Sequence, residues 1–130
     1  MIHDFKSCTH YWLGVYSIKD HRIDVYDSVF DGDEDFVKIK MAMYAIAIPQ
    51  LLKELKFDTK YPNFGTTYKK LDIVYQTAPK QLGETDCGLF VTRFTDLLML
   101  GQDLFKYEWG VEAITIYRRM VAANLLTHGK

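Results

Sequence analysis

The sequence is poor in cysteine, because Cys8 and Cys87 are the only two among its 130 residues. Two cysteines cannot form the disulfide framework that stabilises small secreted domains, so we predict a protein of a reducing, intracellular compartment. Cys8 and the nearby His10 are not accompanied by a CxxC pair or an HxxxH pair, and this argues against a zinc site. The acidic run 31–35 lacks the ligand spacing of an EF-hand and is expected to begin a helix instead.

The chain also lacks an excess of charge of either sign, since its formal net charge is -1. The sequence therefore has no cluster of basic residues to attract nucleic acid. Its many aromatic side chains are expected to fill the core. The longest apolar run, residues 41–52, is too short and too interrupted to span a membrane. Residues 1–6 lack the hydrophobic core of a signal peptide. We therefore predict neither a nucleic-acid partner nor a membrane segment.

No internal repeat, low-complexity segment or interdomain linker is visible in the sequence. The hydrophobic content of 48% is typical of a soluble globular protein, and the length suits one domain with a sizeable core. We therefore predict that residues 1–130 form a single domain.

A β-hairpin is expected first, because residues 11–18 and 22–27 are rich in aromatic and β-branched side chains. If Lys19 and Asp20 form a two-residue loop, Asp27 lies opposite Trp12. His10 then shares a strand face with Trp12 and lies diagonal to Asp27, within reach of a hydrogen bond. The register of this hairpin therefore predicts a contact between His10 and Asp27.

Helices are predicted after the hairpin and again after a loop and a third strand. The first helix is expected to carry an apolar stripe of Phe36, Ile39, Met43, Ile46 and Ala47. Pro49 should kink or end this helix near Ile48, and Leu51, Leu52 and Leu55 are candidates to continue it. We expect a loop over 59–70 and then a strand over 71–76. A helix reaching about Leu100, with Gly101 as its C-cap, and a last helix over 111–126 should follow. This order of elements indicates an α+β fold.

The stretch 81–88, Gln-Leu-Gly-Glu-Thr-Asp-Cys-Gly, places Cys87 at a turn just before a helix. Apolar residues then recur at helical spacing, namely Phe90, Phe94, Leu97 and Leu98. A cysteine at a helix N-terminus meets the positive end of the helix dipole, which favours the thiolate over the thiol. Cys87 is therefore a candidate nucleophile.

A cysteine nucleophile needs a base that is oriented by a third group. Of the four histidines, His3 and His128 lie near the chain ends and His21 lies at the hairpin turn. His10 is the histidine with a carboxylate, Asp27, across the predicted hairpin. We therefore predict a Cys87–His10–Asp27 triad. The side-chain amide of Gln81 and the backbone N–H of Cys87 are the candidate donors to a developing oxyanion.

Three blocks of this sequence resemble the catalytic blocks of the ubiquitin-like-protein-specific proteases, the Ulp-type family of SUMO proteases. They are residues 10–15 (His-Tyr-Trp-Leu-Gly-Val), residues 26–28 (Tyr-Asp-Ser) and residues 81–88. The order His, Asp, Gln, Cys is that of the family. The separations, 27 − 10 = 17 residues from His to Asp and 87 − 81 = 6 from Gln to Cys, also match the family.

The resemblance implies a papain-like cysteine protease fold, with a short mixed sheet flanked by helices. It implies His10, Asp27 and Cys87 as the catalytic triad and Gln81 in the oxyanion hole. The implied reaction is cleavage after the C-terminal diglycine of a ubiquitin-like modifier such as SUMO, in precursors or conjugates. No metal or organic cofactor is implied, and the implied location is nuclear or cytoplasmic.

The sequence departs from the family pattern at specific places. Tyr11 stands where the family usually has a tryptophan over the diglycine channel, and Trp12 follows it, so both are candidate substrate-binding residues. Gly83 stands where an asparagine or a similar residue is usual. The resemblance spans about residues 10–100, so we expect an N-terminally truncated catalytic half. A catalytically inactive interaction module, or an acyl transferase using the same triad, remains an alternative.

Overall fold

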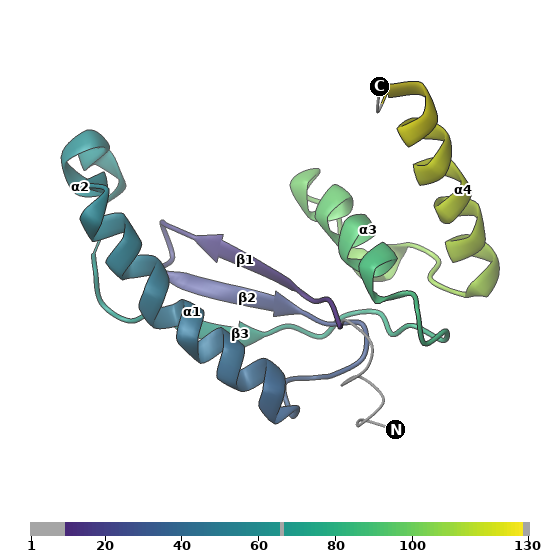
Figure 1. Cartoon of the computed structure of the whole chain (residues 1–130), viewed down its shortest axis with the longest axis horizontal. Helices are drawn as coiled ribbons and strands as arrows, with labels where there is room; N and C mark the ends of the chain where they lie inside the picture. The colour runs from purple at the N-terminus through teal and green to yellow at the C-terminus, as the bar shows by residue number, and fades with distance from the viewer. Residues whose placement is uncertain (1–9, 66, 129–130) are drawn as a thin grey trace. The chain divides into compact units, whose positions relative to one another are not determined.

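The structure is a computed structural model and describes residues 10–65 and 67–128 (Figure 1). Three strands and several helices follow one another along the chain. In order they are β1 (Leu13–Ser17), β2 (Arg22–Tyr26), α1 (Asp35–Glu54), α2 (Phe57–Lys60), the 3-10 helix η2 (Pro62–Phe64), β3 (Asp72–Tyr75), α3 (Cys87–Met99), the 3-10 helix η3 (Leu104–Lys106) and α4 (Val111–His128). The α+β class predicted from the sequence is confirmed.

The chain divides into two compact units. One, the sheet unit, consists of Gly14–Tyr26 and Phe30–Thr77 and holds the sheet and α1. The other, the helical unit, consists, among the described residues, of 10–13, the short piece Asp27–Val29 and 78–128. All four residues of the predicted catalytic centre belong to the helical unit.

The sheet has the strand order β1-β2-β3, with β2 and β3 parallel and Val25 opposite Tyr75. The predicted two-residue hairpin loop is wrong. The turn occupies four residues, 18–21, and ends at His21 with a φ of 53°. Ser17 stabilises this turn, because its Oγ atom accepts from the Asp20 backbone N–H at 3.1 Å. Lys19 and Asp20 nevertheless lie at its centre, so the strand ends at Ser17 and Arg22 are symmetric about them.

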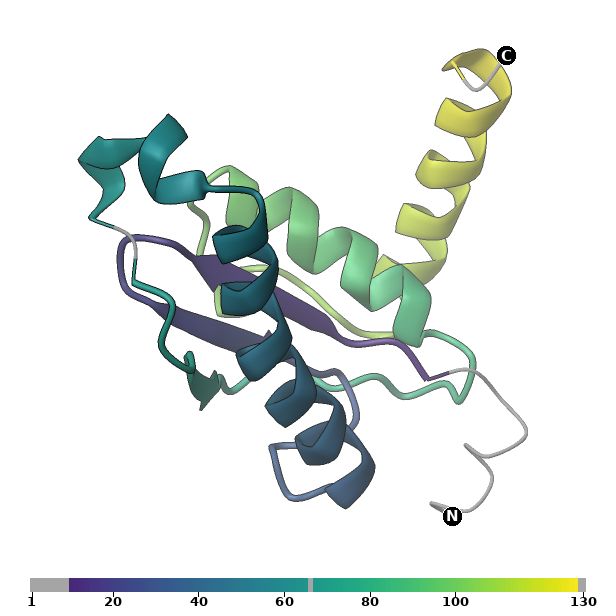
Figure 2. The ribbon, with the colours of Figure 1, turned by 60° about the vertical axis from the view of Figure 1, so that its left-hand side comes forward.

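Helix α1 lies across one face of the sheet (Figures 1 and 2). The predicted apolar stripe is not the buried face of this helix, because four of its side chains are more than half exposed: Phe36 52%, Ile39 61%, Met43 58% and Ile46 55%. The buried residues are Val37, Met41, Ala45 and Pro49. A Cβ atom at Gly14 of β1 would lie 3.2 Å from Met41 Cε, which shows how closely this face meets the sheet. Both faces of α1 are apolar, so periodicity alone did not identify the buried one.

Pro49 lies inside α1, and the helix continues beyond it to Glu54, so of the outcomes left open by the sequence the structure shows continuation through Leu51 and Leu52. A proline has no N–H to donate to the carbonyl four residues earlier, which here is that of Ala45. The Leu71 backbone N–H, just before β3, donates to this carbonyl at 3.0 Å. The contact therefore compensates for the hydrogen bond that proline removes from the helix.

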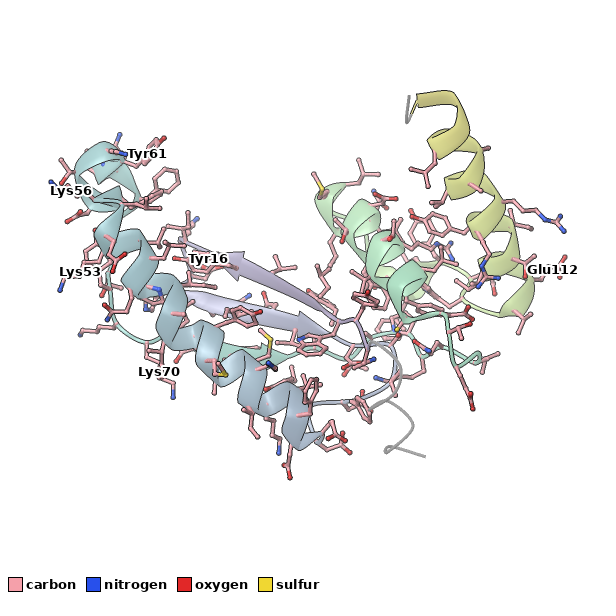
Figure 3. The ribbon with its side chains drawn as sticks, in the orientation of Figure 1. Tyr16, Lys53, Lys56, Tyr61, Lys70 and Glu112 are labelled. Atoms are coloured by element: carbon pink, nitrogen blue, oxygen red, sulfur yellow. The ribbon has the colours of Figure 1, made fainter. Side chains whose placement is uncertain are left out.

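The segment predicted as a loop contains the end of α2 and all of η2. Lys56, labelled in Figure 3, precedes α2 with a φ of 54° and reverses the chain after α1. The rings of Phe57, Tyr61 and Phe64 then pack on one another, with centroids 4.8–6.2 Å apart. This local aromatic cluster stabilises a segment that proline and glycine had marked as irregular.

Three aromatic side chains form the core of the helical unit. Phe90 and Phe94 of α3 are buried, as the predicted stripe required, and their rings lie 5.2 Å and 5.0 Å from that of Trp109. The Trp109 indole N–H donates to the Leu104 carbonyl at 2.7 Å. Helix α3 ends at Met99 with Leu100 as its C-cap, so the predicted C-cap Gly101 lies one residue further on, in the left-handed region with a φ of 71°. Among residues 10–65 and 67–128, no helix is long and apolar enough to cross a membrane.

Candidate active site

Cys87 is the first residue of α3, as the sequence predicted. Its side chain is buried, with 5% of the residue exposed, and its thiol is free of any disulfide. Asp86 precedes it as the N-cap, and the Asp86 carbonyl accepts the Phe90 N–H at 2.9 Å. The sulfur therefore lies at the N-terminal end of a helix of 13 residues, where the helix dipole is positive.

His10 and Asp27 form a hydrogen-bonded pair, which confirms the contact predicted from the hairpin. The distance from His10 Nε2 to Asp27 Oδ2 is 3.0 Å, and the two side chains are only 3% and 4% exposed. The second carboxylate oxygen, Oδ1, accepts the Val29 backbone N–H at 2.8 Å. Because both oxygens are held, the carboxylate has a fixed orientation toward the imidazole.

The pairing through Nε2 decides which ring nitrogen can act as a base. A neutral imidazole that donates from Nε2 to a carboxylate carries its lone pair on Nδ1. Nδ1 of His10 is also buried. In this tautomer Nδ1 is the ring nitrogen with the chemistry of a proton acceptor.

Tyr11 and Trp12 have different surroundings. The Trp12 ring packs on the His10 imidazole, with centroids 5.6 Å apart and an interplanar angle of 33°. Tyr11 is 53% exposed, and a Cβ atom built on Gly88 would lie 3.7 Å from Tyr11 Cδ2. The segment that carries His10 therefore lies beside the residue that follows Cys87.

Gln81 is docked onto Ser28, the residue after Asp27. Its backbone N–H donates to the Ser28 carbonyl at 2.9 Å, and its Oε1 atom accepts from the Ser28 hydroxyl. Its Nε2 atom donates to the Gly83 carbonyl at 2.6 Å. A primary amide has two N–H donors, so one remains for a substrate oxyanion.

Sequence reasoning assigned no role to Ser28, which is 2% exposed and holds Gln81 from a position 53 residues away. It also missed Lys80, whose Nζ atom donates to the Asp27 carbonyl at 2.9 Å. Adjacency to Asp27 and to Gln81 was the only local signal for either residue. The competing His21 lies in the sheet unit, where its Nε2 atom donates to the Lys69 carbonyl at 2.8 Å.

No metal site accompanies this group in the part of the chain that the structure describes, because no three His, Cys, Asp or Glu side chains there are arranged to hold an ion. Cys8 and His3, the other residues considered for metal binding or base chemistry, lie outside the described residues.

Comparisons with known proteins identify the family and the fold of this chain. The family model for the C-terminal catalytic domain of the Ulp1 protease family matches residues 2–121. A solved structure of the SUMO protease Ulp1, with its catalytic cysteine oxidized to a sulfenic acid, matches with a TM-score of 0.60 and 23% sequence identity.

The structural match covers 92% of this chain and 48% of the other, so this chain spans about half the length of that structure. At this identity the likeness concerns the fold. No match was found among curated protein sequences. The family match over most of the chain shows that this chain belongs to the Ulp1 protease family of papain-like cysteine peptidases, in the C-terminal catalytic domain.

Proposed function

We propose that this chain is a thiol protease or isopeptidase that cleaves after the C-terminal diglycine of a ubiquitin-like modifier such as SUMO. The observation that carries the proposal is the buried His10–Asp27 pair, within a unit that also places Cys87 at a helix start. A base oriented by a carboxylate and a cysteine at a helix N-terminus are the parts that thiol acyl transfer requires.

In the first half of the proposed reaction, His10 Nδ1 takes the proton from the Cys87 thiol. The thiolate attacks the carbonyl carbon of the modifier's last glycine, and the C=O electron pair moves onto oxygen. The Cys87 N–H and the second amide N–H of Gln81 stabilise this oxyanion. The intermediate collapses, the C–N bond breaks, and the imidazolium gives its proton to the leaving amine. A thioester on Cys87 results.

In the second half, water attacks the thioester while His10 takes a proton from it. The C–S bond breaks, the imidazolium returns its proton to the Cys87 sulfur, and the modifier leaves as a carboxylic acid that ionises in water. Asp27 remains ionised throughout and stabilises the imidazolium in each half of the cycle. No metal or organic cofactor takes part in this sequence.

We also propose positions for the substrate. The exposed Tyr11 side chain lies beside Gly88, and it is the proposed contact for the diglycine of the substrate. Trp12 instead packs on the His10 ring. We place the protein in the nucleus or cytoplasm, where modifier conjugates occur, and residues 1–130 in one catalytic domain. An inactive interaction module is less favoured, because His10, Asp27, Gln81 and Cys87 are all present.

Covalent probes test this proposal directly. Vinyl-sulfone derivatives of SUMO and of ubiquitin would be incubated with the Cys8→Ser variant, in which Cys87 is the remaining cysteine. We expect a stable adduct between the protein and a modifier probe, with the mass of the protein increased by one modifier. The variant that also carries the substitution Cys87→Ser should form no adduct. If the folded protein is labelled by no modifier probe, whether made from SUMO, from ubiquitin or from another modifier, the proposed function is wrong.

A further inference from the structure

Arg118 of α4 holds the residue that immediately precedes Cys87. Its Nη2 atom forms an ion pair with Asp86 Oδ1. The two side chains differ in exposure, since that of Arg118 is 52% exposed and that of Asp86 only 17%. Arg118 and Asp86 are 32 residues apart in the sequence and lie in the same compact unit. Helix α4 is therefore tied to the first turn of α3, next to the candidate nucleophile.

The Asp86 carboxylate also lies against the loop that leads to Cys87. A Cβ atom built on Gly83 would come within 2.6 Å of Asp86 Oδ2. Real Cβ atoms do not approach an oxygen so closely, so this packing requires glycine at position 83 unless the carboxylate moves. Arg118 opposes such a movement, because it holds the other carboxylate oxygen.

Gly83 connects this carboxylate to the candidate oxyanion donor. Its carbonyl accepts from Gln81 Nε2 at 2.6 Å, and Gln81 Oε1 accepts from the Ser28 hydroxyl. Arg118 is therefore paired with Asp86, the Asp86 carboxylate lies close to Gly83, and hydrogen bonds join Gly83 to Gln81 and Gln81 to Ser28, the residue after Asp27. Arg118 is the outermost member of this series.

We propose that Arg118 is a positioning residue, which fixes residues 82–86 so that the Cys87 thiol and the Gln81 amide keep their relative geometry. It also balances the negative charge of Asp86, the carboxylate next in sequence to the thiol. The catalytic consequence rests on the proposed function, whereas the structural consequence does not. Because an exposed ion pair contributes little to global stability, the effect of its removal should be local to this loop.

The test compares Arg118→Ala with Arg119→Ala, a matched control at the next, exposed position of α4. Hydrogen exchange followed by mass spectrometry would report on a peptide covering residues 82–86. We expect at least threefold faster exchange there in Arg118→Ala, with the thermal midpoint almost unchanged, and no change in Arg119→Ala. Arg118→Lys should restore part of the protection, since an ammonium group can still reach Asp86.

Kinetics on a modifier–fluorophore substrate then separate positioning from binding. We expect kcat of Arg118→Ala to fall about tenfold with KM nearly unchanged, and Asp86→Asn to show a similar fall. The double variant should be no worse than either single variant, because the two side chains act as one unit. Asp86→Asn also provides the test should Arg118→Ala fail to fold.

The two proposals fail in distinguishable ways. If loop exchange is the same in Arg118→Ala and Arg119→Ala, the positioning role is wrong, whatever the activity. If KM rises while kcat stays constant, it is also wrong, because Arg118 then acts in substrate binding. If the loop loosens as expected but wild type processes no modifier, the positioning role holds and the proposed function is wrong.

Discussion

Asp27 Oδ2 lies 3.0 Å from His10 Nε2, and both side chains are almost fully buried. Asp27→Asn would replace an oxygen acceptor by an amide that can donate to Nε2. The imidazole would then carry its proton on Nδ1, the nitrogen that has to act as the base. We expect kcat on a modifier–fluorophore substrate to fall by about 10²–10⁴-fold, as in hydrolases whose orienting carboxylate is changed in this way.

Asp24→Asn is the matched control for this prediction. Asp24 is also a buried carboxylate, but it belongs to the sheet unit, where it accepts from Arg22 Nε at 3.1 Å and from Gln76 Nε2 at 3.0 Å. Its variant should retain kcat per folded molecule, although it should lose stability. A kcat for Asp27→Asn within about threefold of wild type would rule out the orienting role.

Ser28 should act on catalysis only through Gln81. Gln81→Ala removes an oxyanion donor, so we expect kcat to fall about 10²-fold. Ser28→Ala leaves Gln81 Oε1 without its side-chain donor and should lower kcat about tenfold. In Ser28→Ala/Gln81→Ala the fall should equal that of Gln81→Ala alone. Gln102→Ala is the control, since Gln102 is exposed and contacts Tyr107. Additive losses in the double variant would show that Ser28 has a separate role.

The buried face of α1 can be tested with two methionines of the same helix. Met41 is 3% exposed and Met43 is 58% exposed. Met41→Ala should lower the free energy of unfolding by about 2–5 kcal/mol, because it opens a cavity in the core. Met43→Ala should change it by less than about 0.5 kcal/mol. Urea unfolding of both variants measures the difference, and equal losses would contradict the orientation of α1.

The His10–Asp27 contact could be predicted because it depends on local rules. The strands are shorter than predicted, so His10 lies before β1 and Asp27 directly after β2, but Lys19-Asp20 still marks the centre of the turn that joins these strands. The position of Cys87 at a helix start likewise follows from local periodicity. The turn and the helix start were therefore enough to predict the contact of His10 with Asp27 and the position of Cys87 from sequence alone.

Long-range contacts decided the features that the sequence pattern left open or did not indicate. The continuation of α1 past Pro49 depends on Leu71, which donates to Ala45 from the approach to β3. The Ser28–Gln81 and Asp86–Arg118 contacts join residues 53 and 32 positions apart, and no local pattern encodes either. Which apolar face of α1 is buried depends on the sheet that it meets, and the two faces are too similar for periodicity to decide.

Tyr117 makes the stability of the protein depend on pH in the alkaline range. Burial raises the pKa of Tyr117 above its ordinary value. The hydrogen bond from its hydroxyl to Asp96 Oδ2, at 2.7 Å, and the negative charge of Asp96 raise this pKa further. The positive charge of Arg93 lowers it, but by less than these effects raise it. A raised pKa means that folding favours the protonated phenol. The stabilising contribution is therefore complete below about pH 10, where an unfolded tyrosine also stays protonated, and it is lost as the pH rises above that value.

Tyr117→Phe removes this ionisation, so its free energy of unfolding should fall less steeply than that of wild type between about pH 10 and 11.5. Asp96→Asn should give an intermediate slope, because burial still raises the pKa of Tyr117 after the charge and its hydrogen bond are changed. Urea unfolding at several pH values measures these slopes, and tyrosinate absorbance near 295 nm follows the ionisation itself. Identical slopes in wild type and Tyr117→Phe would show that the Tyr117–Asp96 contact does not favour the protonated phenol in the folded state.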